Sequence, residues 1–254
     1  RMLYMTHNSL KIAAVIVTYN RKNELLKTVQ SISALKDTAL DMIIIDNNGS
    51  DGSMQAVHEL KNNRIHYLRQ VENLGSAGGF ACGMDYGLRK GYDFVWLFND
   101  DSRPHPDAFN SLSKAIQSLK NETLGLIKIG MLKNGRSEAS YWKGRRITNY
   151  IPKSDTPVKT DLITFDGCLI NTAVIKKIGT CDPRFFMGIY EFDFCLRALD
   201  AGFSIYTLPN GLIEHEKKGS VKGVPFWRMY YVTRNHLYLG LKRKSIKTIA
   251  AFAA

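Results

Sequence analysis

The sequence predicts an α/β fold in which helices flank a mostly parallel central sheet. Apolar, β-branched stretches alternate with stretches whose apolar residues recur at helical spacing over the first 130 residues. Polar side chains follow several of the apolar stretches, at the edge where open α/β sheets bind ligands. At 254 residues the chain is long enough for one large domain with a small appendage.

The elements of this series are predicted in chain order. Residues 12–18 are apolar and largely β-branched, and in residues 21–35 the side chains of Leu25, Val29 and Ile32 recur at the spacing of a helix. The same reasoning predicts strands at 42–46, 65–68 and 94–98, a short helix ending near residue 61, and a helix at 77–90. Because helices separate the strands, parallel pairing is favoured.

The composition restricts the class of partner. A formal net charge of +12 predicts an anionic binding partner. Nucleic acid, nucleotide diphosphates and anionic lipids are all such partners. Four scattered cysteines without a CxxC pair argue against a zinc ribbon and a disulfide scaffold. Because no apolar run approaches the roughly 20 residues that span a bilayer and the N-terminus has no secretory signal pattern, we expect a cytoplasmic protein.

The segment Trp96–Pro104 is an apolar run that ends in two adjacent carboxylates, Asp100 and Asp101. Side chains alternate along a strand, so Asn99 and Asp101 should point to one face and Asp100 to the other if strand geometry continues that far. One face could then hold a divalent cation and the other a sugar hydroxyl. A turn that leads into a helix near Asp107 explains the same residues equally well.

Two further loops carry polar side chains at predicted strand ends. Asp46, after the second strand, could accept a hydrogen bond from a uracil N–H while Tyr19, after the first, stacks on the base. Strand-end turn chemistry explains both residues equally well. Residues 72–80 form a glycine-containing loop before a helix, an arrangement that lets a backbone approach an anion closely. Its spacing is not GxGxxG, which disfavours a dehydrogenase.

Four segments, taken in order, resemble the nucleotide-sugar motifs of family 2 glycosyltransferases with the GT-A fold: Val17–Arg21, Asp46–Gly52, Asn73–Phe80 and Asn99–Asp101. The resemblance covers about residues 13–240. The Gly-Gly-Phe loop and the later Tyr230-Tyr231-x-x-Arg234-Asn235 look most like galactofuranosyltransferases, with bacterial rhamnosyltransferases close behind. The resemblance implies that the donor is bound by Thr18, Tyr19, Asn20, Arg21, Asp46, Asn48, Asn73, Gly78, Gly79, Asn99 and Asp100.

The resemblance also implies a divalent cation, Mn²⁺ or Mg²⁺, as cofactor. The family usually has three consecutive acidic residues where this chain has Asn99-Asp100-Asp101, so Asp101 is the main predicted metal ligand and Asn99 remains an open one. His215 falls where similar transferases place a histidine that completes the metal coordination, and imidazole is a competent ligand for Mn²⁺. A lone histidine on a strand is otherwise more often structural.

Two acidic residues near the start of a predicted helix are candidates for the catalytic base. Glu191 matches, by resemblance, the residue that removes the acceptor hydroxyl proton in inverting members of the family, whereas the alternative is a carboxylate that favours the helix dipole. Asp193 is the reserve candidate, although its spacing of four from Arg197 predicts an ion pair on the helix. Asp166 and Gly167 could position the acceptor or the donor sugar, and an Asp-Gly turn is the other explanation.

We expect a GT-A catalytic domain over residues 1–224, with a nucleotide-sugar half at about 11–131 and an acceptor half at about 132–224. Residues 225–254 form a basic helical segment with interleaved aromatic residues, which suits contact with a membrane surface carrying a lipid-linked acceptor. A helix docked on the catalytic domain fits this pattern equally well. Because the chain ends in an apolar stretch, we expect a longer native C-terminus.

The sequence thus predicts metal-dependent, inverting sugar transfer from a UDP- or dTDP-linked donor to a glycan or lipid-linked acceptor in bacterial surface polysaccharide synthesis. The resemblance favours UDP-galactofuranose, with dTDP-rhamnose as the alternative. A sugar nucleotidyltransferase is a rival, but it should carry an N-terminal glycine-rich loop, and residues 15–21 contain no glycine. A nucleic-acid-binding module would explain the charge but not the carboxylates at strand ends, so we expect no nucleic-acid partner.

Overall fold

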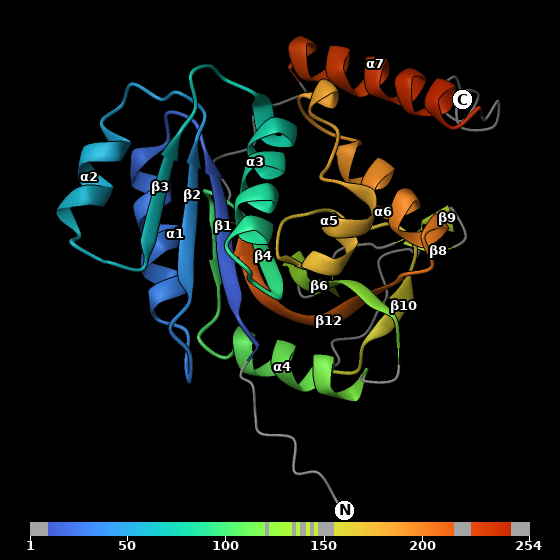
Figure 1. Cartoon of the computed structure of the whole chain (residues 1–254), viewed down its shortest axis with the longest axis horizontal. Helices are drawn as coiled ribbons and strands as arrows, with labels where there is room; N and C mark the ends of the chain where they lie inside the picture. The colour runs from blue at the N-terminus through green and yellow to red at the C-terminus, as the bar shows by residue number, and fades with distance from the viewer. Residues whose placement is uncertain are drawn as a thin grey trace, which may run out of the picture.

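The computed structural model describes residues 10–119, 122–133, 136–137, 141–142, 145–146, 155–215 and 225–244. A large mixed sheet runs through the centre of the molecule, and helices cover both of its faces (Figure 1). This arrangement confirms the predicted α/β class with a central sheet flanked by helices. Within these ranges, no helix combines the length and the apolar composition that a bilayer span requires.

The first half of the chain is a regular alternation of strands and helices, as predicted. Its elements are β1 (Ile12–Thr18), α1 (Lys22–Ser33), β2 (Asp41–Asp46), α2 (Ser53–Glu59), β3 (Ile65–Arg69), α3 (Gly75–Arg89) and β4 (Phe94–Asn99). The four strands pair in parallel in the order β4-β1-β2-β3. Their carboxyl ends therefore meet at one edge of the sheet.

The second half extends the sheet in mixed orientation. Its elements are β5 (Ser102–Pro104), α4 (Ala108–Ser118), β6 (Leu124–Lys133), β7 (Arg136–Ser137), β8 (Tyr141–Trp142), β9 (Arg145–Arg146), β10 (Val158–Thr160), β11 (Cys168–Asn171), α5 (Thr172–Ile178), the 3₁₀-helix η1 (Pro183–Phe185), α6 (Tyr190–Asp200), β12 (Ser204–His215) and α7 (Phe226–Lys242). Strand β11 runs antiparallel between β4 and β6, whereas β12 runs parallel to β6. The predicted parallel arrangement thus describes β1 to β4, and the sheet is mixed beyond β4.

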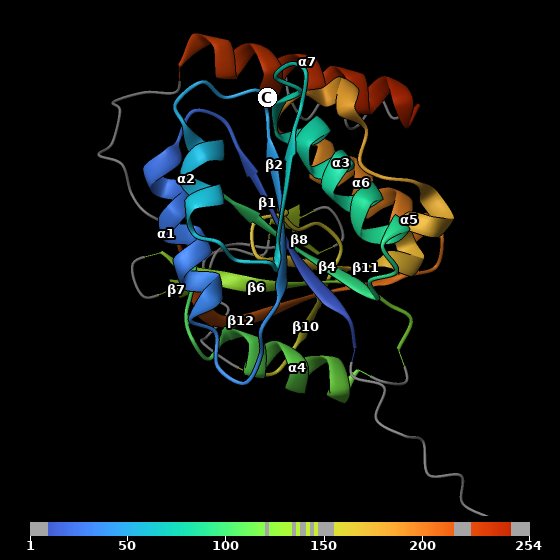
Figure 2. The same cartoon turned by 60° about the vertical axis from the view of Figure 1, so that its left-hand side comes forward.

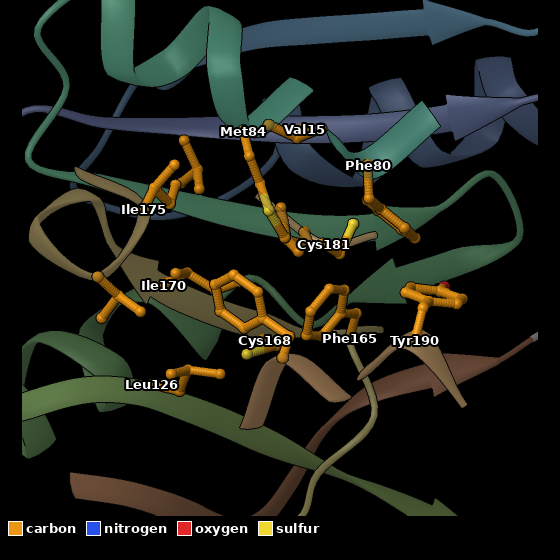
Figure 3. Packing of buried hydrophobic residues seen from close by; sticks show 14 of the residues in the cluster. Val15, Phe80, Met84, Leu126, Phe165, Cys168, Ile170, Ile175, Cys181 and Tyr190 are labelled. Atoms are coloured by element: carbon orange, nitrogen blue, oxygen red, sulfur yellow. The ribbon is translucent and has the colours of Figure 1, made fainter. Parts of the chain in front are cut away.

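An apolar core lies on each face of the sheet. Every residue of β1 is buried, since its side chains point alternately into the two cores. Val15 and its alternate neighbours in β1 pack toward α3, α5 and α6, and the residues between them pack toward α1 and α4. Figure 3 shows the first core, where three aromatic rings converge: Phe80 of α3, Tyr190 of α6, and Phe165 from the segment before β11. Phe165 meets both other rings edge to face. This contact joins α3 to the start of α6.

Helix α3 lies unusually close to the sheet because glycines face β1. A Cβ at Gly79 would lie 2.5 Å from Val17 Cγ1, and one at Gly83 would lie 2.3 Å from Val15 Cγ1. The absence of side chains at these positions therefore permits the close approach. As a result, the first turn of α3 lies near the carboxyl ends of β1 and β4.

Helix α7 lies across the end of the molecule near the first turns of α3 and α6 (Figures 1 and 2). It is fastened there by Lys242, whose Nζ is 3.0 Å from Asp182 Oδ2 and 2.9 Å from Asp193 Oδ1. The aromatic ring of Tyr238 packs against Phe185 with a centroid distance of 4.9 Å. The segment predicted as helical at 225–254 is helical over Phe226–Lys242 and is docked on α6 and η1, and residues 245–254 lie outside the described ranges.

Candidate active site

A cavity of about 480 Å³ opens where β4 ends, and it brings together residues that are far apart in the sequence. Its walls come from the turn after β4, from the first turns of α3 and α6, and from the start of α7. The lining residues are Arg21, Ser76, Asn99, Asp100, Asp101, Met187, Gly188, Tyr190, Glu191, Pro225, Trp227, Arg228 and Val232. A larger cavity of about 880 Å³ lies at the amino ends of β1 and β2, away from these carboxylates. The smaller cavity is therefore the candidate site.

The condition for alternation of Asn99, Asp100 and Asp101 is not met, and the alternative explanation, a turn, describes Asp100 and Asp101. Strand β4 ends at Asn99 and the next two residues form a turn, so the side chains no longer alternate between faces. Instead, one guanidinium contacts both carboxylates: Arg21 Nη1 is 2.8 Å from Asp100 Oδ1, and Nη2 is 2.7 Å from Asp101 Oδ2. The planar guanidinium thus donates one nitrogen to each carboxylate and holds the two side chains next to each other.

The electrostatic state of Asp100 reflects its burial. Burial raises the pKa of Asp100 to about 6, although the charge of Arg21 and a hydrogen bond from Thr18 act in the opposite direction. The Thr18 hydroxyl donates to Asp100 Oδ2 at 2.9 Å. The ends of β1 and β4 are thus joined through side chains that the sequence placed in separate motifs.

Asp166 and Gly167, predicted as acceptor-binding residues, do not line this cavity. Asp166 is buried, and its Oδ1 accepts hydrogen bonds from the Asn99 backbone N–H at 3.0 Å and from the Ser102 hydroxyl. Gly167 has a φ of +74° and its carbonyl accepts a hydrogen bond from the Trp96 indole at 3.2 Å. The alternative explanation, an Asp-Gly turn, describes them. Asp166 stabilises the Asp100–Asp101 turn through its hydrogen bonds with the two residues that flank it, Asn99 and Ser102.

The donor set at this turn fits a hard divalent cation. Asp100 and Asp101 supply carboxylate oxygens, which Mn²⁺ and Mg²⁺ prefer. The backbone of His215 pairs with Ser102, one residue beyond Asp101, which brings β12 to the same turn. The His215 side chain lies outside the part of the chain whose side chains are described. Without it, the described side chains contain no cluster of three metal-binding residues.

The expected base-binding residues lie at the ends of β1 and β2, as predicted. Tyr19 is exposed, whereas Asp46 is buried. Asp46 Oδ1 accepts a hydrogen bond from the Gly49 N–H at 2.7 Å, and Oδ2 accepts one from the Tyr67 hydroxyl at 2.8 Å. Burial and this bond raise the pKa of Tyr67 well above its ordinary value, so the phenol remains a donor. Both Asp46 oxygens are therefore engaged in local structure.

Asn20 and Asn48 shape the same pair of loops. Both have positive φ values, 53° and 63°, which asparagine tolerates better than most residues. Asn20 Oδ1 accepts a hydrogen bond from the Ser50 N–H at 2.7 Å, and Asn48 Oδ1 accepts one from Arg69 Nη2 at 3.0 Å. The first bond ties the loop after β1 to the loop after β2, and the second ties the loop after β2 to the end of β3.

Gly78 and Gly79, expected to bind the donor, lie in the helix that the sequence predicts at 77–90, and this helix starts two residues earlier than predicted. Helix α3 begins at Gly75, and both residues are buried within it. A Cβ at Gly78 would lie 2.4 Å from Leu74 Cβ, and one at Gly79 would lie 2.5 Å from Val17 Cγ1, so the packing of the first turns of α3 requires both glycines. Asn73 Oδ1 accepts a hydrogen bond from the Gly75 N–H at 2.9 Å, which caps the first turn.

The structure separates the two candidate bases. Glu191 lies in the first turn of α6 and lines the cavity. Asp193 is fully buried, and its Oδ2 accepts hydrogen bonds from Arg197 Nε and Lys242 Nζ, both at 2.9 Å. The predicted pair with Arg197 is therefore present and is extended by α7. Asp193 holds α6 to α7, and of the two only Glu191 lines the cavity.

The loop that leads to Glu191 is held by a residue that the sequence did not single out for this role. Asn235 in α7 is fully buried, and its side-chain amide lies within hydrogen-bond distance of the carbonyls of Phe185 at 2.9 Å, Met187 at 2.7 Å and Gly188 at 3.0 Å. Arg234 Nη2 donates to the same Phe185 carbonyl at 2.7 Å. The Arg-Asn pair was part of the resemblance, and its role is visible only in the folded chain.

This loop needs external support because its backbone is unusual. Phe186 and Ile189 have positive φ values of 61° and 68°, which cost energy for residues with a bulky or branched side chain. The Phe186 ring stacks on Tyr231 of α7, and the Phe186 carbonyl accepts a hydrogen bond from the Ala77 N–H of α3 at 3.0 Å. Contacts from α3 and α7 therefore stabilise the conformation that places Glu191.

Comparison with known proteins identifies the family. Residues 13–179 match the model of glycosyl transferase family 2. Galactofuranosyltransferase GlfT1 of Mycobacterium tuberculosis is 40% identical over 208 residues, which cover 77% of this chain and 67% of the relative. The dTDP-rhamnosyl transferase RfbF of Shigella flexneri is 24% identical over 243 residues, covering 90% and 79% of the two chains.

Solved structures agree on the fold. The structure of GalNAc-T7 with UDP, GalNAc and Mn²⁺ superposes with a TM-score of 0.73 at 15% identity, over 92% of this chain and 48% of that one. At this identity the likeness concerns the fold alone. Together with the sequence matches, it shows that the chain belongs to glycosyl transferase family 2.

Proposed function

We propose that this chain transfers a sugar, with inversion, from UDP-galactofuranose to a glycan or lipid-linked acceptor in bacterial surface polysaccharide synthesis, with the help of Mn²⁺ or Mg²⁺. One observation carries the proposal: the 480 Å³ cavity places the Asp100–Asp101 carboxylate pair and Glu191 in the same space. The 40% identity to a galactofuranosyltransferase supports the choice of donor. The similarity to a dTDP-rhamnosyl transferase supports dTDP-rhamnose as the alternative donor.

The donor end of the site is the turn after β4. Asp101, with Asp100 and His215, would hold the cation, which supplies positive charge to the departing diphosphate. Asn99 is less suited to this role, because its amide is a weaker ligand than a carboxylate. Tyr19, exposed at the end of β1, offers an aromatic face on which the nucleotide base would stack.

The acceptor end of the site is the first turn of α6. Glu191 would take the proton from the attacking acceptor hydroxyl, a contribution typically worth about 10²- to 10⁴-fold in rate. The buried Asp193 already accepts hydrogen bonds from Arg197 and Lys242, so we assign it to positioning α6. The contacts of Asn235 hold the loop before Glu191 in place, which keeps the base oriented toward the cavity.

We further propose a cytoplasmic location with contact between α7 and the inner face of the membrane. Four large apolar side chains are exposed along α7, at successive intervals of four, seven and four residues: Phe226, Tyr230, Leu237 and Leu241. Their spacing places them on one side of the helix. Such a stripe next to basic residues suits an anionic membrane surface, where a lipid-linked acceptor would be found.

The direct test is a donor screen that measures nucleotide release with Mn²⁺ and a panel of octyl glycosides as acceptors. We expect UDP release from UDP-galactofuranose, and loss of both release and Mn²⁺-dependent UDP binding in Asp101→Ala. Asp193→Asn is the matched control, since it should lower stability but retain Mn²⁺-dependent UDP binding. Release from dTDP-rhamnose alone would establish the alternative donor. Silence across all donors together with tight RNA or DNA binding would refute a transferase.

A further inference from the structure

The cavity has a wall that neither the family motifs nor the predicted acceptor residues account for. Its lining includes Trp227, Arg228 and Val232, all from the first two turns of α7. Trp227 is 56% exposed although it lines a cavity, so a large aromatic side chain is accessible to solvent there. Asp166 and Gly167, the residues expected to contact the acceptor, do not line this cavity. Recognition of an acceptor in this cavity therefore falls to other residues.

Arg228 differs from the other cationic side chains of α7. Arg234 donates to backbone carbonyls of the loop before α6, and Lys242 contacts Asp182 and Asp193. Among the described residues, the guanidinium of Arg228 has no hydrogen-bond or ion-pair partner. Two of the three cations of α7 thus fasten the helix to the domain, while the third lines the cavity and, within the described part of the chain, has all its donors available to a ligand.

The position of this wall relative to Glu191 is fixed by the structure. Asn235, two turns after Trp227, lies within hydrogen-bond distance of the carbonyls of Met187 and Gly188 in the loop that leads to Glu191. Because one buried amide joins α7 to this loop, a molecule resting on Trp227 keeps a defined position relative to the Glu191 carboxylate. This is the requirement for an acceptor whose hydroxyl must meet the base.

We propose that Trp227 and Arg228 form the acceptor subsite. The ligand is a carbohydrate whose apolar ring face packs on the indole, and whose phosphate-linked carrier contacts the guanidinium. A broad aromatic surface with one convergent cation suits this combination, since an indole buries the C–H face of a sugar and a guanidinium matches phosphate oxygens in two-point contact. The inference rests on the proposed function and adds to it the chemistry of the acceptor.

The test compares two probes that carry the same sugar: the octyl glycoside that supports the most nucleotide release in the acceptor panel above, and the farnesyl diphosphate of that sugar. Their binding to the protein is measured by calorimetry in the presence of UDP and Mn²⁺. Trp227→Ala should weaken both probes by about tenfold, and Arg228→Ala should weaken only the diphosphate-linked probe by about tenfold. The matched control is Met229→Ala, because Met229 is 51% exposed on the same helix but neither lines the cavity nor belongs to the proposed membrane-contacting stripe.

The donor side of the site is the internal reference. Mn²⁺-dependent UDP binding and the melting temperature should be unchanged in Trp227→Ala and Arg228→Ala. Wild-type affinity of both variants for both probes would overturn the subsite, as would failure of the wild-type protein to bind either probe while it binds UDP. An equal loss of both probes in Arg228→Ala would overturn the phosphate contact. Absence of UDP binding in the wild-type protein would instead refute the proposed function itself.

Discussion

Arg21 Nη2 lies 2.7 Å from Asp101 Oδ2, and this contact joins the loop after β1 to the turn after β4. The two residues are 80 positions apart in the sequence, and parallel pairing of β1 with β4 brings them together. The guanidinium supplies positive charge to the two carboxylates that we propose as cation ligands. Arg21 and a divalent cation therefore compete for, or share, the oxygens of Asp101.

Arg21→Gln should reveal this competition. Loss of the guanidinium leaves the carboxylates without their counter-charge, so Mn²⁺ affinity in the absence of nucleotide should rise about fivefold, or about 1 kcal/mol. The free energy of unfolding should fall by about 1–3 kcal/mol without the metal, because two buried carboxylates lose their partner. Electron paramagnetic resonance titration of Mn²⁺ and urea denaturation measure the two effects. Arg21→Lys, which keeps the charge, is the control, and weaker Mn²⁺ binding in Arg21→Gln would contradict the competition.

Glu191→Gln should abolish proton removal while leaving donor binding intact. The amide has the shape of the carboxylate but cannot accept the acceptor proton, so kcat should fall by about 10²- to 10⁴-fold. Affinity for UDP and Mn²⁺ should stay close to that of the unchanged protein, since Glu191 lies on α6 and not at the turn after β4. Steady-state kinetics and UDP calorimetry check the two expectations. Unchanged turnover would remove Glu191 as the base.

Asn235→Ala should impair catalysis from a distance. The substitution removes the amide that supports the carbonyls of Phe185, Met187 and Gly188, so the free energy of unfolding should fall by about 1–3 kcal/mol. Because this loop positions Glu191, kcat should fall while KM for the donor changes little. Thermal unfolding and kinetics at saturating donor distinguish the two effects. His236→Ala, at the next position of α7, is the control, and a loss of stability with unchanged kcat would assign Asn235 a purely structural role.

The free energy of unfolding should depend on pH through the ionisation of Asp182. Burial by itself raises the pKa of Asp182, but hydrogen bonds from Arg184 and Lys242 outweigh burial and hold the pKa well below its usual range. A carboxyl whose pKa is lower in the folded state stabilises the protein above its unfolded pKa of about 4, and this contribution is lost as the pH falls. Asp182→Asn should therefore cost only about 1 kcal/mol at pH 7, because solvent around the exposed Arg184 side chain screens this ion pair, and less at pH 3. An equal cost at both pH values, measured by urea denaturation, would contradict this account.

Local pattern was sufficient for the first half of the fold. Apolar periodicity predicted β1 to β4 and the helices between them, since each of these elements buries one face or both against its neighbours. It placed the start of α3 at residue 77, whereas the helix begins at Gly75, inside the segment interpreted as a glycine-containing loop. The spacing of four that continues from Gly79 to Gly83 and Gly87 was the available signal of a helix packed closely on a strand.

The amino-acid order alone therefore established the α/β class, the family and the polar motifs at the strand ends, because these depend on short-range periodicity and on motif order. It could not establish which motif residues share one cavity. The fork of Arg21 onto Asp100 and Asp101, the burial of Asp193 and the support of the Glu191 loop by Asn235 join positions that lie up to 80 residues apart. Such contacts depend on the register of β1 against β4 and on the docking of α7, which arise only when the whole chain packs.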